Sequence, residues 1–274
     1  LRQQLKSLTT HEQIWNVPNV LTLSRLVAAP AVGYLILHDQ HAWALGLFAY
    51  AGITDLVDGW IARRWQLQTV VGSVVDPMAD KLLMAVTAAC LAAKGALPGP
   101  LAILIFGRDA SLAIAAIYYR YASLPSPKTF ARYWDFSLPS AEVHPTSVSK
   151  INTFLQLALI GLTLLFPVIA HTAIATAAAL VSQPPPSDLP SLVITSVTAL
   201  QFLVGATTLW SGFSYAVLKN AVTILGSDDQ LKKRQGAIGR RIIGSSFAAV
   251  CVGAMAWAVG VDGWFSNDKG EDEE

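Results

Sequence analysis

Long apolar runs separated by short polar segments dominate this chain. Six of the runs are about twenty residues long, the length that an α-helix needs to cross the hydrocarbon core of a bilayer. They are Val20–Leu37, Trp43–Ile61, Val74–Ala93, Leu101–Tyr118, Val148–Ala170 and Ser191–Val217. The pattern therefore predicts an all-α, polytopic membrane protein with about six transmembrane helices.

The apolar pattern divides the chain into three parts. Residues 1–18 predict an N-terminal interfacial arm, residues 19–220 the six-helix domain, and residues 221–274 a C-terminal extension that ends in an acidic tail. The extension holds another apolar stretch, residues 242–259, which fits either a seventh span or a helix lying on the membrane surface. Because the chain begins with Leu1 rather than Met, we also expect a segment upstream, such as a transit peptide.

The composition agrees with a membrane protein. Hydrophobic residues make up 53% of the 274 residues, charged residues make up 14%, and the formal net charge is +1. These values exclude an ordinary soluble domain, and we expect membrane lipids rather than nucleic acid as partners. Cys90 and Cys251 lie in apolar runs without a C-x-x-C partner, so they predict core thiols rather than a disulfide or a metal site.

Basic residues collect on one side of the predicted bundle. If the six runs cross the membrane in turn, the opposite loops hold only Lys94. By the positive-inside rule the basic face is cytosolic, or faces the matrix in a mitochondrial membrane. The residues on the basic face are Arg2, Lys6, Arg63, Arg64, Arg120, Lys128, Arg132, Lys150, Lys219, Lys232, Lys233 and Arg234.

Four aspartates lie at the end of the second apolar run and the start of the third. Asp55 and Asp58 are three residues apart, and Asp76 and Asp80 are four apart, so each pair projects from one face of a helix. A carboxylate within apolar membrane sequence costs about 2.5–3.5 kcal/mol even on a lenient insertion scale, so four together require compensation. Bound divalent cations would supply it.

The carboxylates also indicate which ions would bind. Ligands made only of oxygen suit hard cations, here Mg²⁺ or Mn²⁺ with Ca²⁺ as a substitute, and exclude the thiolate and imidazole ligands typical of zinc. Two ions held between carboxylates are the usual arrangement for phosphoryl transfer. We therefore expect two divalent ions in each active site, held by the aspartates at positions 55, 58, 76 and 80.

Small and basic residues lie among the aspartates. Gly59 directly follows Asp58, and the missing side chain would let a nucleotide approach the backbone. Gly72 could act in the same way or could serve helix packing, which is a common use of small residues in membrane helices. Arg63 is placed to contact a phosphate oxygen, and a snorkelling charge at the membrane interface is the alternative.

The spacing D-x2-D-G-x2-A-R-x8-G-x3-D-x3-D resembles the signature of the CDP-alcohol phosphotransferases. The residues that carry the resemblance are Asp55, Asp58, Gly59, Ala62, Arg63, Gly72, Asp76 and Asp80. The resemblance implies a six-helix membrane enzyme, usually a homodimer, which displaces CMP from a CDP-linked substrate with two divalent metals.

The same resemblance implies a role for each position of the motif. The first metal would be held by Asp55, Asp58 and Asp76, and the second would be held or flanked by Asp55, Asp76 and Asp80. Asp80, with Asp76 beside it, would be the catalytic base that takes the proton of the acceptor hydroxyl. The residues that would line the nucleotide site are Asp55, Asp58, Gly59, Ala62, Arg63 and Gly72.

Sequence outside the motif resembles the eukaryotic CMP-forming cardiolipin synthases. The matching pieces include V-P-N-V-L-T-L-S-R at Val17–Arg25, G-R-D at Gly107–Asp109 and P-T-S-V-S-K-I-N-T at Pro145–Thr153. This resemblance implies that the phosphatidyl group of CDP-diacylglycerol is transferred to phosphatidylglycerol. It also implies the mitochondrial inner membrane, with the active site facing the matrix. The part from Ser182 onwards matches weakly.

Three cations lie within or at the ends of the apolar runs, namely Arg25, Arg108 and Lys150. A cation inside a membrane is costly unless it meets an anion. The three cations therefore predict a binding site for the phosphodiester of a phosphatidylglycerol-like acceptor. Pairing with the aspartates of the motif or with Asp109 is the alternative. Further polar residues on one face of the fifth run could add hydrogen bonds near that site, namely Ser149, Asn152 and Gln156.

Two other functions fit parts of the pattern. Phosphatidylglycerophosphate synthase, from the same family, uses glycerol 3-phosphate as the acceptor; its members tend to show a G-K-x-K-T element where this chain has S-K-I-N-T at Ser149–Thr153. A non-catalytic transporter or scaffold with a buried acidic metal site is the alternative from another class. Transporters commonly contain repeats of broken helices, and no such repeat is evident in this sequence.

Overall fold

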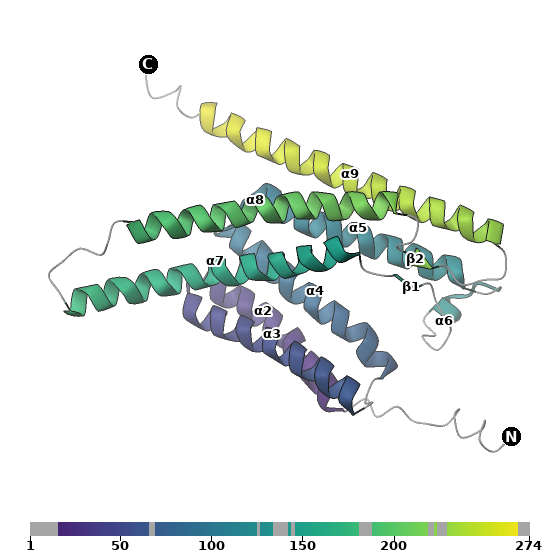
Figure 1. Ribbon diagram of the computed structural model, residues 1–274, viewed down its shortest axis with the longest axis horizontal. Coiled ribbons are helices and arrows are strands. Elements are labelled where there is room, and N and C mark those ends of the chain that lie inside the picture. Colours follow the sequence, from purple (N-terminus) through teal and green to yellow (C-terminus); the bar gives the residue numbers. More distant parts are fainter. Residues whose placement is uncertain are drawn as a thin grey trace. The chain divides into compact units, whose positions relative to one another are not determined.

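Helices account for nearly all of the described structure. The computed structural model describes residues 16–65, 69–124, 127–133, 142–143, 146–180, 188–218, 222–223 and 229–267. Its long helices, labelled in Figure 1, are α2 (Val17–Leu37), α3 (His41–Arg64), α4 (Val70–Ala93), α5 (Gly99–Ser123), α7 (Ser147–Leu180), α8 (Asp188–Val217) and α9 (Asp229–Asn267). The remaining elements are the short helix α6 (Phe130–Tyr133) and the antiparallel two-residue strands β1 (Glu142–Val143) and β2 (Val222–Thr223). The predicted all-α class is confirmed.

Five helices in the described part of the chain are long and apolar enough to cross a membrane. The segments are Val17–Leu37, His41–Ala62, Gly99–Ser123, Ser147–Ala170 and Lys233–Gly260. Four of them contain predicted runs, and the fifth contains residues 242–259, for which the sequence left two alternatives open. The other two predicted runs form most of α4 and α8, which are 24 and 30 residues long. The architecture is that of a polytopic membrane bundle.

Proline, glycine and one left-handed aspartate mark the helix ends. Pro18 lies in the first turn of α2, where its missing N–H leaves no hydrogen bond unmade. Asp39 follows α2 with a φ of 60°, a left-handed conformation that aspartate tolerates better than most residues. Gly95 follows α4 with a φ of 72°, as is common after a helix C-terminus, and Pro100 lies in the first turn of α5. These residues keep the connections α2–α3 and α4–α5 short.

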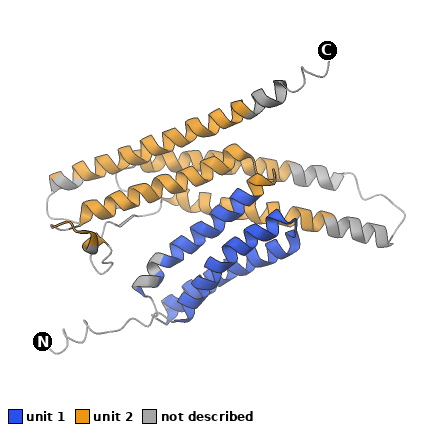
Figure 2. Cartoon of the chain, turned by 180° about the vertical axis from the view of Figure 1, so that it is seen from behind, with its two compact units in different colours: residues 1–90 blue, residues 91–274 orange. Residues whose placement is uncertain are grey.

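Packing divides the chain into two compact units, residues 1–90 and residues 91–274 (Figure 2). In the first unit α2 packs along α3. Gly33 of α2 lies close to α4, since a β-carbon at this glycine would come within 2.6 Å of the Val86 side chain. Small residues allow helix backbones in membranes to approach one another closely. The buried alanines of α2 and α3 are Ala28, Ala29, Ala44 and Ala51.

The second unit includes the C-terminal helix. In this unit α5 runs alongside α9 and contacts α8, while α8 contacts both α7 and α9 (Figure 1). A buried cluster joins Ala115 and Tyr119 of α5 to Tyr215 of α8 and Ile243 of α9. Helix α9 is therefore an integral part of this bundle. The division at residue 220 predicted from the sequence stays a prediction about domains.

Candidate active site

Arg25 is the buried cation of the first unit. It lies on α2 three residues after Thr22 and six after Asn19, so the three polar side chains share one face of the helix. Only 1% of the Arg25 side chain is exposed. A guanidinium buried this deeply in an apolar helix must be paired with anions to be tolerated.

Three carboxylates supply that pairing. Nη1 of Arg25 lies 2.8 Å from Oδ1 of Asp55 and also contacts Oδ1 of Asp80. Nη2 of Arg25 lies 2.5 Å from Oδ2 of Asp58. Because Asp55 and Asp58 belong to α3 and Asp80 to α4, these ion pairs join the three helices of the unit. For Arg25, the sequence analysis left two alternatives open, binding of an acceptor phosphate and pairing with the aspartates. In the structure Arg25 pairs with the aspartates.

Asp76, the fourth aspartate of the motif, also contacts α2. Its Oδ1 atom accepts a hydrogen bond from the hydroxyl of Thr22. Thr22 is buried, and its hydroxyl lies 3.1 Å from the carbonyl oxygen of Pro18. The structure therefore brings all four aspartates against the face of α2 that carries Thr22 and Arg25.

The carboxylates differ in their exposure. The side chain of Asp58 is 6% exposed, whereas those of Asp55 and Asp80 are 42% and 45% exposed. The group consequently has a closed end at Asp58 and an open side at Asp55 and Asp80.

The carboxylates fit hard divalent cations by their chemistry. They offer only oxygen donors, and three of them already converge on one positive charge. Among the residues that the structure describes, no three acidic, histidine or cysteine side chains lie close enough to hold an ion as they stand. A planar guanidinium binds carboxylates through two separate nitrogen atoms, whereas Mg²⁺ coordinates its oxygen ligands directly, at a metal–oxygen distance of about 2.1 Å. A divalent ion held by these carboxylates would therefore compete with the Arg25 side chain for their oxygens.

Gly72 lies where α4 approaches α2. A β-carbon at Gly72 would lie 2.6 Å from Oδ1 of Asn19 and 2.9 Å from Oγ1 of Thr69. The N–H of Gly72 donates to Oγ1 of Thr69 at 2.9 Å, and Nδ2 of Asn19 donates to the same oxygen at 3.0 Å. These contacts give Gly72 a packing role, one of its two alternatives. The nucleotide-binding roles of Gly72 and of the half-buried Gly59 and Ala62 stay predictions.

Arg63 is the one residue of the motif whose side chain lies outside the described part of the structure. Its backbone belongs to the last turn of α3, one residue before the exposed Arg64. Its predicted contact with a phosphate oxygen therefore stays a prediction.

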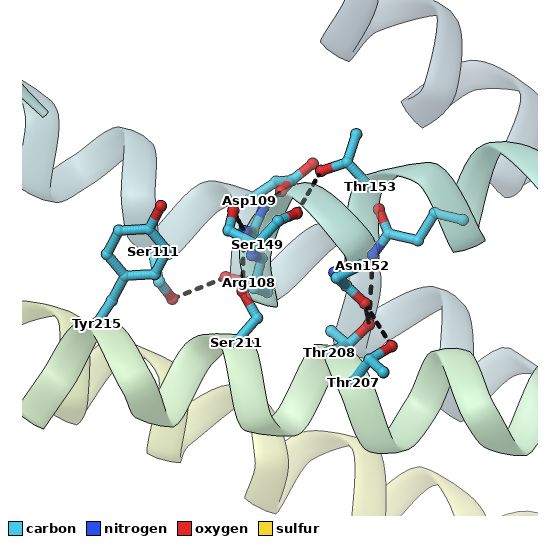
Figure 3. Close-up of polar contacts among 12 residues, drawn as sticks. Arg108, Asp109, Ser111, Ser149, Asn152, Thr153, Thr207, Thr208, Ser211 and Tyr215 are labelled. Carbon is cyan, nitrogen blue, oxygen red and sulfur yellow. Dashed lines mark hydrogen bonds and ion pairs between the residues drawn. The ribbon is translucent and has the colours of Figure 1, made fainter. Parts of the chain in front are cut away.

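A second polar cluster surrounds Arg108 on α5 (Figure 3). The arginine is 3% exposed. Its Nη1 atom donates to Oδ1 of Asp109 at 2.6 Å. Its Nη2 atom donates to the hydroxyl of Ser149 on α7 and, at 3.0 Å, to the hydroxyl of Ser211 on α8. The ring of Tyr215 lies 5.9 Å from the guanidinium carbon. The cluster connects α5, α7 and α8.

Amide and hydroxyl groups extend this cluster between α7 and α8. Oδ1 of Asn152 accepts hydrogen bonds from the hydroxyls of Thr207 at 2.8 Å and Thr208 at 2.9 Å. Nε2 of Gln156 donates to the hydroxyl of Thr208 at 3.3 Å. Two buried donors, Nε of Arg108 and Nδ2 of Asn152, have no hydrogen-bond partner among the described residues. The cluster therefore retains donor capacity for an oxygen-rich group.

The three cations predicted to bind an acceptor phosphate have different surroundings. Arg25 lies with the aspartates of the first unit, and Arg108 lies in the cluster of the second unit. Lys150 is exposed on α7. Neither unit by itself brings the three together.

Several hydrogen-bonding residues were not singled out from the sequence. Asn19 and Thr22 precede Arg25 at intervals of three, and this spacing is a signal that could have found them. Ser149 and Asn152 were expected near Arg108, but their partners on α8 were not. The corresponding signal on α8 is the spacing of Thr208, Ser211 and Tyr215.

The chain matches a family model and several named proteins. Residues 15–183 match the family model described as CDP-alcohol phosphatidyltransferase. A cardiolipin synthase (CMP-forming) / mitochondrial hydrolase fusion protein of Schizosaccharomyces pombe is 43% identical over 215 residues, which cover 78% of this chain and 33% of the relative. A cardiolipin synthase (CMP-forming) of Homo sapiens is 43% identical over 159 residues, which cover 58% of this chain and 53% of the relative.

A third relative carries a different name. The chloroplastic CDP-diacylglycerol–glycerol-3-phosphate 3-phosphatidyltransferase 1 of Oryza sativa subsp. japonica is 33% identical over 160 residues, which cover 57% of this chain and 48% of the relative. The chain thus spans between a third and about half of the length of these three relatives. The family match includes the aspartate motif and extends through α7 as far as residue 183. This chain belongs to the CDP-alcohol phosphatidyltransferase family.

Proposed function

We propose that this chain transfers the phosphatidyl group of CDP-diacylglycerol to phosphatidylglycerol, giving cardiolipin and CMP. The observation that carries the proposal is the group of carboxylates around Arg25, which lies inside the motif of the family. The relatives named CMP-forming cardiolipin synthases support the choice of acceptor.

In the proposed reaction, the free hydroxyl of phosphatidylglycerol attacks the lipid-side phosphorus of CDP-diacylglycerol. A new P–O bond forms, the diphosphate P–O bond breaks, and CMP leaves with the bonding electron pair. The hydroxyl proton passes to Asp80, which acts as the general base. The exposure of Asp80 on the open side of the carboxylate group supports this role, since a base must reach the proton that it removes. Arg63 is proposed to contact the phosphate of the departing CMP.

The family is generally dependent on divalent metals. We propose two Mg²⁺ or Mn²⁺ ions, with Ca²⁺ as a substitute. When bound, such ions polarise phosphoryl oxygens and neutralise the charge that develops on the leaving group. Arg25 would be the counter-ion of the carboxylates before metal binds. The proposed metal ligands are Asp55, Asp58, Asp76 and Asp80, and the proposed nucleotide contacts include Gly59, Ala62 and Gly72.

Arg108 and Lys150 are proposed to bind the phosphodiester of the acceptor, with Arg25 as a third contributor once metal has taken its place. The Nε atom of Arg108, a buried donor with no partner among the described residues, supports this role. An arginine donor and an anionic oxygen form one of the stronger hydrogen bonds found in proteins. The neighbouring Nδ2 of Asn152 could donate to the same headgroup.

A product assay tests the proposed reaction. Purified protein in detergent would receive CDP-diacylglycerol with equal amounts of phosphatidylglycerol and glycerol 3-phosphate, and the lipids would be identified by mass spectrometry. We expect cardiolipin as the main product and release of CMP that requires Mg²⁺. Phosphatidylglycerophosphate as the main product would instead favour the second candidate, which the name of the Oryza relative supports. Absence of CMP release with both acceptors would favour a transporter or scaffold.

Replacing Arg108 by Gln should impair use of the acceptor more than use of the nucleotide lipid. We expect the KM for phosphatidylglycerol to rise on the order of tenfold or more, because one charged hydrogen bond to the acceptor is lost. The KM for CDP-diacylglycerol should change much less. Steady-state kinetics with each lipid varied in turn would measure both values. An equal rise in the two constants would place Arg108 in the nucleotide site or in the fold.

We further propose a homodimer in the mitochondrial inner membrane with the active site facing the matrix. Membrane insertion is supported by the apolar helices, and the mitochondrial location by the resemblance to eukaryotic cardiolipin synthases. The orientation rests on the excess of basic residues in the loops on the side of the aspartate motif.

Cysteine labelling tests this orientation. Gln40, between α2 and α3, and Thr129, between α5 and α7, are exposed and would each be replaced by Cys in a chain lacking Cys90 and Cys251. A membrane-impermeant thiol reagent should label Gln40→Cys once the outer membrane is ruptured. The same reagent should label Thr129→Cys only after the inner membrane is opened. The reverse pattern would contradict the matrix-facing site.

A further inference from the structure

The face of α9 that points into the second bundle has a regular spacing. Ile243, Phe247, Val250 and Ala254 follow one another at intervals of four, three and four residues. Ile243, Phe247 and Ala254 are buried, and Val250 is half-buried. Such a spacing gives a helix one continuous contact stripe. The stripe lies beyond residue 183, where the family match ends.

Two side chains of the stripe occupy notches made by glycines. The Val250 side chain lies where a β-carbon of Gly107 on α5 would be, and the Phe247 ring lies where a β-carbon of Gly212 on α8 would be. In both cases several side-chain atoms fill the space, so a methyl group at either glycine could not be accommodated without movement of α9 or its partner. Gly99 of α5 and Gly239 of α9 also face side chains closely, those of Trp257 and Tyr119. By contrast, a β-carbon at Gly253 of α9 or at Gly161 of α7 would meet nothing within 4 Å.

The two notches flank one hydrogen bond. Gly107 immediately precedes Arg108, and Gly212 immediately follows Ser211, the residue that accepts a hydrogen bond from Nη2 of Arg108 at 3.0 Å (Figure 3). Ile243, the first member of the stripe, belongs to the same buried cluster as Tyr215. The ring of Tyr215 lies 5.9 Å from the guanidinium carbon of Arg108. Contacts from α9 therefore reach the backbone on both sides of the Arg108–Ser211 pair and the aromatic ring beside it.

We propose that Phe247 and Val250 are positioning residues for Arg108, and that α9 holds α5 and α8 at the separation that the Arg108 cluster requires. This inference rests on the proposed function, in which Arg108 binds the phosphodiester of the acceptor lipid. Neither α9 residue touches substrate. They act by fixing the register of α5 and α8, whose side chains form the acceptor site. Register matters because a small displacement of a binding group weakens binding and catalysis.

A paired substitution tests the proposal. Gly107→Ala should raise the KM for phosphatidylglycerol on the order of tenfold and lower the Tm, because the added methyl group pushes against Val250. Val250→Ala in the same chain makes room for that methyl group and should restore most of both values. The second notch offers the same pair in Gly212→Ala and Phe247→Leu. Gly253→Ala and Gly161→Ala are the matched controls and should leave KM and Tm near those of the unaltered protein.

The two readouts separate the ways in which the proposal can fail. A KM that stays unchanged while the Tm falls and recovers would show that α9 stabilises the bundle without positioning Arg108. A Tm loss in Gly107→Ala that Val250→Ala does not recover would overturn the contact itself. If the unaltered protein makes no cardiolipin, the proposed function is wrong, and so is the lipid-binding role of Arg108. The Tm values of the variants would still show whether α9 packs in the notches.

Discussion

Asp80→Asn should reduce kcat by roughly 10²–10⁴-fold, the range expected when a general base is removed. Asn keeps the size of the side chain and can still accept a hydrogen bond from Arg25, so the fold of the first unit should persist. The Asn side chain cannot take a proton from the acceptor hydroxyl, and it offers a divalent ion no negative charge. The measurement is CMP release from CDP-diacylglycerol at saturating phosphatidylglycerol and Mg²⁺.

Two further variants sharpen the interpretation of this result. Asp76→Asn should lose activity to a similar degree, because it removes a proposed metal ligand while leaving the base in place. Asp39→Asn is the matched control, since Asp39 is an exposed loop residue whose left-handed backbone suits Asn equally well. Near-normal turnover in both Asp80→Asn and Asp76→Asn would contradict the two-metal mechanism.

Arg25→Gln should destabilise the metal-free protein strongly. The substitution leaves Asp55, Asp58 and Asp80 facing one another without the guanidinium that joins them, and breaking a buried ion pair in this way typically costs about 3–5 kcal/mol. For a chain of this size the Tm in EDTA should fall on the order of 10 °C. Added Mg²⁺ should raise the Tm of Arg25→Gln more than that of the unaltered protein, because the ion then has no guanidinium to displace.

Two control variants separate the effect of the Arg25 charge from the effect of its forked geometry. Arg25→Lys keeps the charge but cannot bridge two carboxylates with a rigid fork, so its Tm in EDTA should lie between those of the other two proteins. Arg64→Gln removes an exposed arginine at the end of α3 and should change the Tm little. If Arg25→Gln melted in EDTA like the unaltered protein, Arg25 would not be the counter-ion of the carboxylates.

The helices of the bundle were largely predictable from the sequence. In hydrocarbon, a backbone must satisfy its own hydrogen bonds, so an apolar run of spanning length has few alternatives to a helix. The ends were less predictable, because helices such as α7, which reaches Leu180, continue past the apolar run. The status of α9 was open for a different reason. Its Gly, Ala and Ser content fits a surface helix as well as a packed one. The buried Ile243 and the notches at Gly107 and Gly212 show that it is packed.

That each aspartate pair shares one helix face was also predictable, whereas the partner of Arg25 was not. Spacings of three and four residues bring each aspartate pair to one face of a helix whatever the neighbouring helices do. A buried cation, by contrast, can be satisfied by a carboxylate of the protein or by a phosphate of the substrate. The choice between them depends on how α2 lies against α3 and α4, which is a property of tertiary packing.

The cluster around Arg108 shows the same limit. Its members on α7 were expected from their common helical face, but Ser211 and Thr208 lie in a stretch of α8 where Ser and Thr are frequent. Hydroxyl residues in membrane helices commonly bond to the carbonyl of the preceding turn, as Thr163 does with Leu159 at 2.7 Å. Sequence alone therefore could not separate the hydroxyls that reach another helix from those that do not.

Arg25 precedes along the chain all three carboxylates with which it pairs. In chain order, α2 comes first with its buried positive charge, and α3 follows with Asp55 and Asp58. Insertion of the two helices together as a hairpin allows their opposite charges to pair, which lowers a cost of about 2.5–3.5 kcal/mol or more for each unpaired charge. Helix α4 then brings Asp80 to a guanidinium that is already in place. The order of charges along residues 1–90 thus lets the three helices of this unit neutralise one another's buried charges without any residue of the second unit.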